Sequence, residues 1–505
     1  MKKRSLGIVL SYSYTFVNMV CGLFLSAFLL RSLGDNEYGL YQTVAAFANY
    51  LVMLEFGTGT AMTRNVVACR NADDEVALKR NISTIWLLSI VLSVLIALVS
   101  LIFGLNIGAV YSKSMTAAQI PYAQKIFAVI TVYLIMSFFT QTFNGILLGM
   151  EQYTFSSIMN VVKVLTRTAT LIAVISFKPY AMSIAFVDLC INGGVLIATY
   201  VFCKKNYKIK LSPRYFDPKV LANIAPLCLA LLLQTIVNQA NNSVDKFIIG
   251  IKMSMESVAL YSVAQYIYTV FSSVTTVPIS MYLPQVSKDL SAGLEGREFT
   301  RTLIQPCRLV VLLGGLIMCG FFAIGRQFIS LVYGSSKTDA WIYALLIIVP
   351  MFINMTNGIL VNVLNVTNKR LVRSLILTGT TALNILLTWF FIDWIGMIGA
   401  VIATAVSTLI GQVILMNIYY SKRMGISVMY LFAQAFKGLL PAEVVSGGAA
   451  FAVASVIPNT LLSFLAGGAT FVILCVVLFV LFGFNDTEKA KVKSIINKFS
   501  RGKIS

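Results

Sequence analysis

The chain has 505 residues, of which 58% are hydrophobic and only 11% are charged. A soluble globular protein carries about 25% charged residues, so this composition excludes a soluble enzyme, a disordered chain and a secreted disulfide scaffold. The net charge of +20 can indicate nucleic-acid binding. Basic loops beside apolar segments, however, are typical of contact with anionic lipid headgroups, so membrane lipids are expected as partners and nucleic acid is not. We therefore predict an integral membrane protein.

Two further counts limit the chemistry. The sequence contains no histidine, which excludes histidine-ligated metals and imidazole-based catalysis. Its eight cysteines form no Cys-x-x-Cys pair and mostly lie in apolar runs, so they are expected to act as small hydrophobic residues. No cofactor and no metal site is predicted.

Fourteen apolar segments are long enough to cross about 30 Å of hydrocarbon as helices, which takes roughly 20 residues each. The predicted spans are 6–30, 38–62, 82–106, 123–148, 153–177, 179–203, 221–250, 256–283, 303–333, 341–365, 371–392, 396–420, 441–458 and 460–484. The thirteenth is the least distinct, because Lys437, Pro441 and Glu443 lie at its start. The first is too long for the apolar core of a signal peptide and is expected to stay in the protein.

The basic residues of the loops alternate in number along the chain. With the N-terminal end taken as cytoplasmic, 27 lysines and arginines fall on that side of the membrane and 5 on the other. Cytoplasmic loops are enriched in these residues, so we predict that both termini are cytoplasmic and that the number of spans is even.

An internal repeat divides the chain. Residues 33–41 read LGDNEYGLY and residues 253–261 read MSMESVALY, while the tetrapeptide NGIL occurs at 144–147 and at 357–360. Similar offsets indicate two six-span halves plus an extra pair of spans, although chance similarity between apolar segments is the alternative. The predicted parts are an N-terminal lobe 1–203, a cytoplasmic linker 204–220, a C-terminal lobe 221–420, an extra helix pair with an interfacial segment 421–484, and a basic amphipathic tail 485–505.

The fifth predicted span has one polar face that carries two cations. Its polar residues follow helical spacing: Ser156, Asn160, Lys163, Arg167 and Thr170. Each cation at the bilayer centre costs roughly 2.5–3.5 kcal/mol, so exposure of this face to lipid is implausible. Either Lys163 and Arg167 face a hydrophilic cavity, or snorkelling or a buried ion pair, for instance between Lys163 and Asp188, accounts for both cations. In the first case they can bind a diphosphate, with help from Lys246 and Arg308 and with Arg326 as a further cation.

Other spans carry amides, hydroxyls and tyrosines at helical spacing. Such groups suit the hydrogen bonding and stacking of a sugar, although many of them can instead bind neighbouring helices together. The predicted sugar path consists of Asn18, Asn160, Gln234, Asn238, Asn241, Tyr261, Gln265 and Tyr268. Three carboxylates, Glu55, Asp188 and Asp245, are candidates for ion coupling, and no cluster of ligands singles one out.

Short motifs give the chain a family resemblance. They are Leu33-Gly34-x-x-Glu37-Tyr38-Gly39, then Gly57-x-Gly59 with Arg64, and the segment 245–250, which reads DKFIIG and is followed by Val258-Ala259-x-Tyr261. With these motifs and fourteen spans, the chain resembles the polysaccharide (O-antigen) flippases of the multidrug/oligosaccharidyl-lipid/polysaccharide exporter superfamily.

The resemblance implies an all-α membrane protein with two six-helix bundles in a V around a central cavity, plus the C-terminal helix pair. It implies alternating access and movement of an undecaprenyl-diphosphate-linked oligosaccharide across the bacterial cytoplasmic (inner) membrane, for cell-surface polysaccharide biosynthesis. A polysaccharide polymerase and glycosyltransferases are the implied protein partners. In such flippases the last two spans are thought to accommodate the lipid chain, which suits the apolar segment 460–484.

Three other kinds of membrane protein fit the sequence less well than a polysaccharide flippase. An ion-coupled drug or metabolite exporter of the same superfamily typically has twelve spans and often an acidic residue in the first, where this chain has Asn18. Lipid II flippases carry arginines inside their first two spans, whereas Arg31 and Arg64 lie at span ends. A membrane glycosyltransferase or polymerase usually needs an acidic motif or large loop on the outer face, and the only acidic run, at 73–75, lies in a predicted cytoplasmic loop. We therefore expect a transporter and not an enzyme.

Overall fold

The computed structural model describes residues 2–490 except 56, 113, 208–210, 368 and 486–487, and within the helices it leaves out the side chains of 2–12, 53, 230, 233–234, 237–238, 240–243 and 370. In this part of the chain every regular element is a helix. The elements are α1 (Lys2–Leu51), η1 (Val52–Glu55), α2 (Thr58–Asn71), α3 (Glu75–Val110), α4 (Gln119–Gly149), α5 (Tyr153–Phe177), α6 (Ala181–Tyr207), η2 (Pro213–Tyr215), α7 (Pro218–Lys252), α8 (Met255–Met281), α9 (Leu283–Ser291), α10 (Gly296–Val332), η3 (Ser335–Lys337), α11 (Ala340–Thr356), α12 (Gly358–Val366), α13 (Arg370–Ile395), α14 (Met397–Thr408), η4 (Leu409–Leu415), α15 (Met416–Met424), α16 (Val428–Phe436), α17 (Leu439–Val456), α18 (Thr460–Leu478) and η5 (Phe479–Gly483).

The helices agree with the predicted spans. Among the described residues, ten helices are long and apolar enough to cross a membrane, and the pair α11–α12, bent by 43°, makes an eleventh. α1 counts once in this total, although its backbone leaves helical geometry at Gly34. The part before Gly34 contains the first predicted span, while the second predicted span covers the part after it, η1 and the start of α2. α7 and α8 occupy the seventh and eighth predicted spans. The all-α membrane fold is thus confirmed, and the helices accommodate about fourteen spans.

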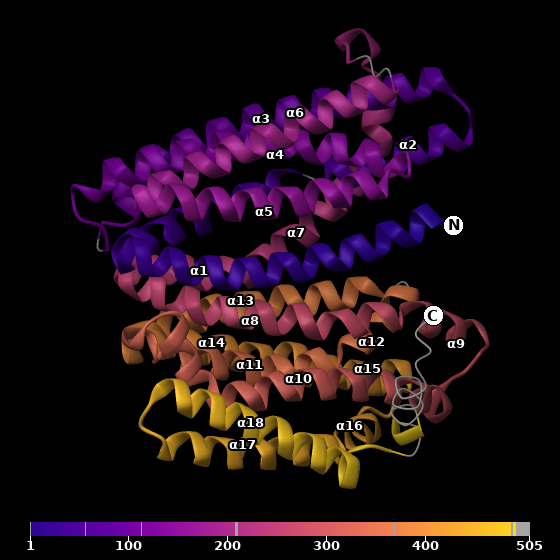
Figure 1. Cartoon of the computed structure of the whole chain (residues 1–505). Coiled ribbons are helices and arrows are strands. Elements are labelled where there is room, and N and C mark those ends of the chain that lie inside the picture. The colour runs from indigo at the N-terminus through magenta and orange to yellow at the C-terminus, as the bar shows by residue number, and fades with distance from the viewer. Residues whose placement is uncertain are drawn as a thin grey trace. The chain divides into compact units, whose positions relative to one another are not determined.

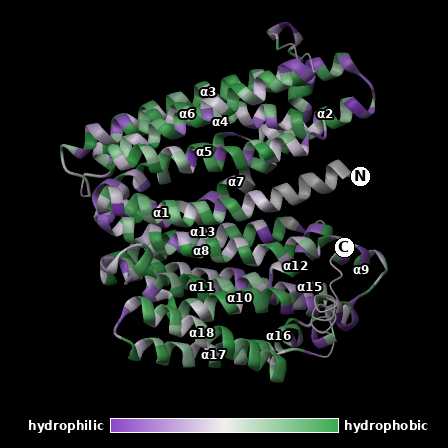
Figure 2. Cartoon of the chain, in the orientation of Figure 1, coloured by the Kyte–Doolittle hydropathy of each residue, from purple (hydrophilic) through white to green (hydrophobic). Residues whose placement is uncertain are grey.

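The outer surfaces of the helices are apolar. Large hydrophobic side chains stand exposed, among them Phe177 at 87% and Trp394 at 80% of their full area. Figure 2 shows hydrophobic residues along most of the helix lengths, with hydrophilic residues gathered at several helix ends and connections. Such surfaces are expected where lipid, and not water, surrounds the helices.

The chain divides into two compact units, Met1–Ser262 and Val263–Ser505. In the first unit α3, α4, α5 and α6 lie side by side (Figure 1), and α4 packs on both α3 and α6. Buried residues of α4, such as Phe127 and Ile130, form its core with residues of α1, α3 and α6. The linker predicted at 204–220 lies within this unit. The boundaries of the two predicted lobes, 1–203 and 221–420, remain a prediction.

The geometry of the turn in α1 has a direct physical cause. Gly34 adopts φ 77°, a backbone conformation that glycine tolerates and other residues rarely adopt. Three residues later, Oε2 of Glu37 accepts hydrogen bonds from the backbone N–H of Ala181, at 2.8 Å, and from the hydroxyl of Tyr122, at 3.3 Å. Glu37 therefore binds the first residue of α6, where a carboxylate is favoured by the helix dipole, and ties α1 to α4 and α6.

The two repeated segments, residues 33–41 and 253–261, contact each other inside the first unit. A Cβ added at Gly39 would overlap the carbonyl oxygen of Met255, so only glycine fits there. Next to this contact, the Thr43 hydroxyl lies 3.4 Å from Sδ of Met255. The missing side chain at position 39 thus lets α1 approach the first turn of α8 at backbone distance.

In the second unit α10 is the central helix. It packs against α11, α16, α17 and α18, while α13 packs on α14. The part predicted as an extra helix pair with an interfacial segment, 421–484, contains the short helix α16, and Met429 on this helix is 84% exposed. Most of the predicted amphipathic tail, residues 491–505, lies outside the described residues.

Candidate functional site

The two cations of the polar face on α5 meet α6 at successive turns. Arg167 Nη2 donates to Oδ2 of Asp188 at 3.0 Å, and Nε donates to Oδ1 of the same carboxylate. The Tyr41 hydroxyl of α1 also donates to Oδ2, at 3.2 Å. Asp188 is buried. A bidentate arginine–carboxylate pair is the strong form of this interaction, so the charge of Arg167 is neutralised inside the unit.

Lys163 lies one turn away, with a neutral partner. Its Nζ donates to Oδ1 of Asn192 at 2.8 Å, and the Asn192 amide donates to the backbone carbonyl of Asp188 at 2.6 Å. Within the described residues Lys163 has no carboxylate within ion-pair distance, because Asp188 is bound to Arg167. The site therefore keeps one net positive charge, on Lys163. One alternative from the sequence was an ion pair between Lys163 and Asp188. In the structure Asp188 pairs with Arg167 instead.

A polar cavity opens beside Lys163 between α4, α5 and α6. Its volume is about 60 Å³, which is space for a few water molecules and less than a diphosphate needs. Its polar lining consists of Ser137, Thr140, Gln141, Asn144, Ser156, Asn160, Lys163 and Thr199. Within it, the Ser156 hydroxyl donates to Oδ1 of Asn144 at 2.6 Å. Asn160 and Lys163, two of the predicted site residues, thus line one cavity.

A second polar group lies where α7 ends and α8 begins. The Tyr261 hydroxyl donates to Oδ2 of Asp245 at 2.7 Å, and both residues are buried. Lys246 is partly buried beside them. Aromatic rings surround this group: the ring centroid of Phe247 lies 6.0 Å from that of Tyr50 and 6.1 Å from that of Phe47. The structure does not bring Asp245 or Lys246 to the cavity beside Lys163.

Arg308, predicted as a fourth diphosphate ligand, is buried in the second unit with all its donors in use. Its Nε and Nη2 donate to the two carboxylate oxygens of Glu488, at 2.8 and 2.9 Å. The remaining donors bind the backbone carbonyls of Gln434, Lys437 and Gly483. A guanidinium has five N–H groups, so none is left for a substrate in this conformation.

The other predicted residues are dispersed. Asn18 is exposed on α1, and Glu55 is partly buried at the end of η1. In the second unit Gln265 is partly buried, and the Tyr268 hydroxyl lies 3.6 Å from Sδ of Met351. The side chains of Gln234, Asn238 and Asn241 lie outside the described residues.

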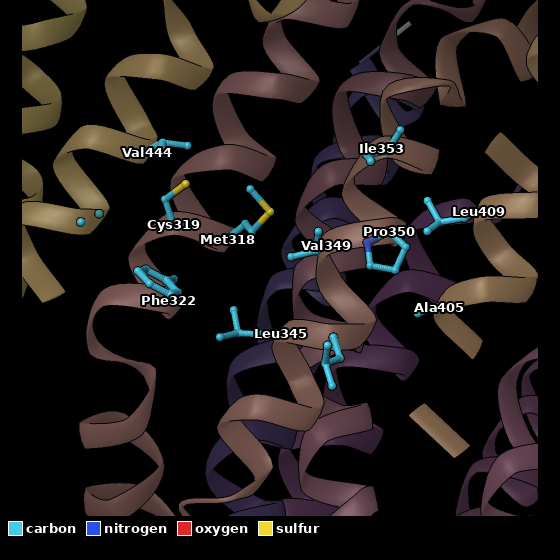
Figure 3. Close-up of a pocket in the computed structure, with 13 residues that line it drawn as sticks. Met318, Cys319, Phe322, Leu345, Val349, Pro350, Ile353, Ala405, Leu409 and Val444 are labelled. Atoms are coloured by element: carbon cyan, nitrogen blue, oxygen red, sulfur yellow. The ribbon is translucent and has the colours of Figure 1, made fainter. Parts of the chain in front are cut away.

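The second unit contains an apolar cavity of about 600 Å³. Figure 3 shows side chains of α10, α11, α14 and α17 around it. The lining residues are Met318, Cys319, Phe322, Leu345, Leu346, Val349, Pro350, Ile353, Ala405, Leu409, Val444, Gly447 and Gly448. A cavity of this size and lining suits a flexible hydrocarbon chain.

Sequence reasoning missed two partners in the site. Asn192 and Tyr41 complete the hydrogen bonds around Lys163 and Asp188. A signal for Asn192 was present, because Asp188 and Asn192 are four residues apart, as are Lys163 and Arg167. Residues at this spacing share one helix face, so two facing helices bring the four side chains together in two rungs. No comparable signal marks Tyr41.

Solved structures share the fold. The chain superimposes on "Lipid II flippase MurJ, inward closed conformation" with a TM-score of 0.68 and 15% identity, covering 93% of this chain and 99% of that one. A multidrug resistance MATE family transporter of the MOP superfamily, in its inward-facing conformation, matches with a TM-score of 0.55 and 17% identity, covering 83% and 95%. Among curated sequences, a putative O-antigen transporter of Shigella flexneri is 21% identical over 401 residues, 78% of this chain and 92% of the relative.

The fold defines a membrane protein with many spanning helices. The sequence pattern of the family described as "Polysaccharide biosynthesis protein" matches residues 6–289. This match covers more than half of the chain, which therefore belongs to that family. The prediction of a transporter of polysaccharide biosynthesis, and not an enzyme, is confirmed.

Proposed function

We propose that the protein flips an undecaprenyl-diphosphate-linked oligosaccharide across the cytoplasmic membrane by alternating access, as one step of cell-surface polysaccharide synthesis. Family membership supports the polysaccharide pathway. The name of the Shigella flexneri relative supports an O-antigen-type substrate. Such a substrate has three parts of different chemistry: an anionic diphosphate, a polar sugar and a long hydrocarbon chain.

The observation that carries this proposal is the ammonium of Lys163, which lies beside a polar cavity within membrane-spanning helices and, among the described residues, binds an amide and no carboxylate. A cation that only stabilised the fold would be expected to have a carboxylate partner, as Arg167 has in Asp188. A phosphate oxygen can replace the Asn192 amide oxygen as the acceptor for Lys163 and form a stronger, charge-assisted bond. The cavity has to widen for this, which a change between inward and outward conformations can provide.

The other two parts of the substrate have suitable surroundings. Amides and hydroxyls of α4 and α5 beside Lys163, such as Gln141 and Asn160, are the groups that bind sugar hydroxyls. The apolar cavity of the second unit is suited to part of the hydrocarbon chain. Arg167 is proposed to position Lys163 and Asn192 through Asp188, and the remaining predicted residues stay candidates for the sugar path.

The cellular setting follows from the same proposal. The protein is expected in the bacterial inner membrane with both termini in the cytoplasm, since 27 loop lysines and arginines lie on one side and 5 on the other. The glycosyltransferases that build the substrate and the polymerase that consumes it are the proposed partners.

The test is flipping of a fluorescent lipid-linked oligosaccharide in proteoliposomes. Replacing Lys163 with methionine removes the ammonium and keeps most of the chain length. Because a hydrogen bond to a charged group contributes about 1.5–3 kcal/mol, the flipping rate should fall about 10- to 100-fold. Lys178→Met is the matched control, since Lys178 is an exposed lysine at the end of the same helix. It should flip at the wild-type rate.

Wild-type flipping by Lys163→Met would overturn the assignment of Lys163. Loss of flipping in both lysine variants would mean that the effect comes from the total charge of α5. No flipping by the wild-type protein, with this substrate or with diphosphate lipids carrying other sugars, would overturn the proposed function itself.

A further inference from the structure

Glu443 is a carboxyl group buried inside the membrane-spanning part of the second unit. It lies in the first two turns of α17, and none of its surface is exposed. Neither carboxyl oxygen has a hydrogen-bond partner among the described residues. Other buried carboxylates, by contrast, are bonded: Asp188 binds Arg167, and Asp245 binds Tyr261.

The carboxyl of Glu443 lies against the backbone of α10. A Cβ added at Gly315 would overlap Oε2 of Glu443, so the absence of a side chain at 315 makes the space that the carboxyl fills. The titratable groups that face it are the thiols of Cys319 on α10 and Cys475 on α18. Within the described residues no cation forms an ion pair with it.

An ionised carboxylate is not stable in these surroundings. Moving an unpaired charge from water into an apolar interior is so costly that such a group binds a proton instead. Glu443 therefore holds a proton while α17 is packed on α10. To lose the proton, the carboxyl needs water or a cation, and both require α17 to move away from α10.

We propose that Glu443 is the proton-binding site that couples this transporter to a proton gradient: the proton is bound while α17 is packed on α10 and is released when the two helices separate. The inference rests on the proposed transport function for its role, because it names the coupling ion. Cys319 and Gly447 lie between α10 and α17 and also line the apolar cavity. Separation of the helices would therefore open this cavity at the moment of proton release.

The first experiment measures proton binding without any substrate. Infrared difference spectra of the purified full-length protein, recorded during a pH titration, should contain the carbonyl band of a buried carboxylic acid at neutral pH. Glu443→Gln keeps the shape of the protonated side chain and should lack this band. Glu256→Gln, which alters an exposed carboxyl of α8, is the control and should keep it. The same band in wild type and Glu443→Gln would overturn the proposal.

The second experiment links the proton to movement and transport. In proteoliposomes, Glu443→Gln should lose about tenfold in flipping driven by a pH gradient, while exchange of labelled substrate without a gradient stays near the wild-type rate. Cys319, which is buried, should react with a membrane-permeable maleimide more at alkaline than at neutral pH, and this rise should be smaller in Glu443→Gln. Wild-type gradient-driven flipping by Glu443→Gln would overturn the coupling role.

These readouts separate the two proposals. If the wild-type protein flips no lipid-linked sugar but the infrared band and the Cys319 labelling depend on Glu443, the proton site stands and the proposed substrate is wrong. If the protein flips its substrate and Glu443→Gln matches the wild type in all three measurements, the substrate stands and the proton site is wrong.

Discussion

Four side chains in two facing pairs set the charge between α5 and α6 in the first unit. Arg167 faces Asp188, and Lys163 faces Asn192, one helical turn apart on α5 and α6. The two cations are four residues apart and carry the same charge, but they have different hydrogen-bond partners. Arg167 belongs to a neutral pair, whereas Lys163 is hydrogen-bonded to a neutral amide and, among the described residues, forms no ion pair of its own. The difference lies on α6, and the polar face of α5 alone does not reveal it.

A double-mutant cycle tests the pair of Arg167 and Asp188. Removing one partner leaves a buried charge without compensation, so Arg167→Gln and Asp188→Asn should each destabilise the protein by about 3–5 kcal/mol. The double variant Arg167→Gln, Asp188→Asn keeps neutral hydrogen-bonding groups on both helices and should recover much of this loss. Thermal unfolding of the purified protein in detergent provides the measurement. Additive effects of the two substitutions would show that the pair is not coupled.

At the scale of elements, Arg308 joins four segments at one end of the second unit. From α10 its guanidinium binds Gln434 near the end of α16, Lys437 directly after α16, the last residue of η5 and the start of the tail at Glu488. Three of these contacts are backbone carbonyls at helix ends, where cations are favoured. Arg308 therefore caps several helices at once, a role that its position in an apolar span does not reveal.

Acid should weaken this junction. Burial alone would raise the pKa of Glu488, but hydrogen bonds from Arg308 and the backbone of Asn485, together with the Arg308 charge, hold it below its ordinary value. With a lowered folded-state pKa, the stabilisation is present above the unfolded value of about 4.3 and is lost as pH falls through the folded value.

Glu488→Gln measures that contribution. Its melting temperature should lie below that of the wild type at pH 7, and the gap should close below about pH 4. Asp217→Asn, at a separate N-terminal cap in the first unit, is a comparison for general acid effects. A gap that does not change with pH would mean that Glu488 acts through its shape and not its charge.

At the scale of the whole molecule, the sequence was sufficient for the class of fold. Helices in a bilayer must satisfy their own backbone hydrogen bonds, so a run of about 20 apolar residues has few alternatives to a span. This is why the predicted segments fall on helices, although some of them, such as 38–62, run over more than one helical element. Breaks within spans, such as the 43° bend between α11 and α12, were not predicted.

The site was predicted less completely than the fold. Helical spacing indicates which residues of α5 share a face, and this was sufficient for Lys163 and Arg167. It does not indicate which helix lies opposite, so the partners Asn192 and Tyr41 were missed. Arg308 was misjudged as an available cation for the same reason, since its acceptors are mostly backbone carbonyls that any sequence carries.

The orientation in the membrane gives a test of the whole topology. In a variant whose native cysteines are replaced by serine, Ala117→Cys lies in a predicted outer loop and Arg214→Cys in a predicted cytoplasmic loop, and both positions are exposed. A membrane-impermeant maleimide added to cells with a permeabilised outer envelope should label residue 117 and spare residue 214. Labelling of residue 214 alone would show that the protein has the orientation opposite to the predicted one.

The rung between Lys163 and Asn192 also has a genetic consequence. Asparagine and aspartate codons differ only in their first base, so one nucleotide change at position 192 would give Lys163 a carboxylate. That change would make the two rungs alike and remove the net charge, and it would be well tolerated by the fold because a second ion pair of the Arg167–Asp188 type would form. A selection for cells that lose surface polysaccharide should therefore recover Asn192→Asp as a mutation that leaves the protein folded but unable to transport its substrate.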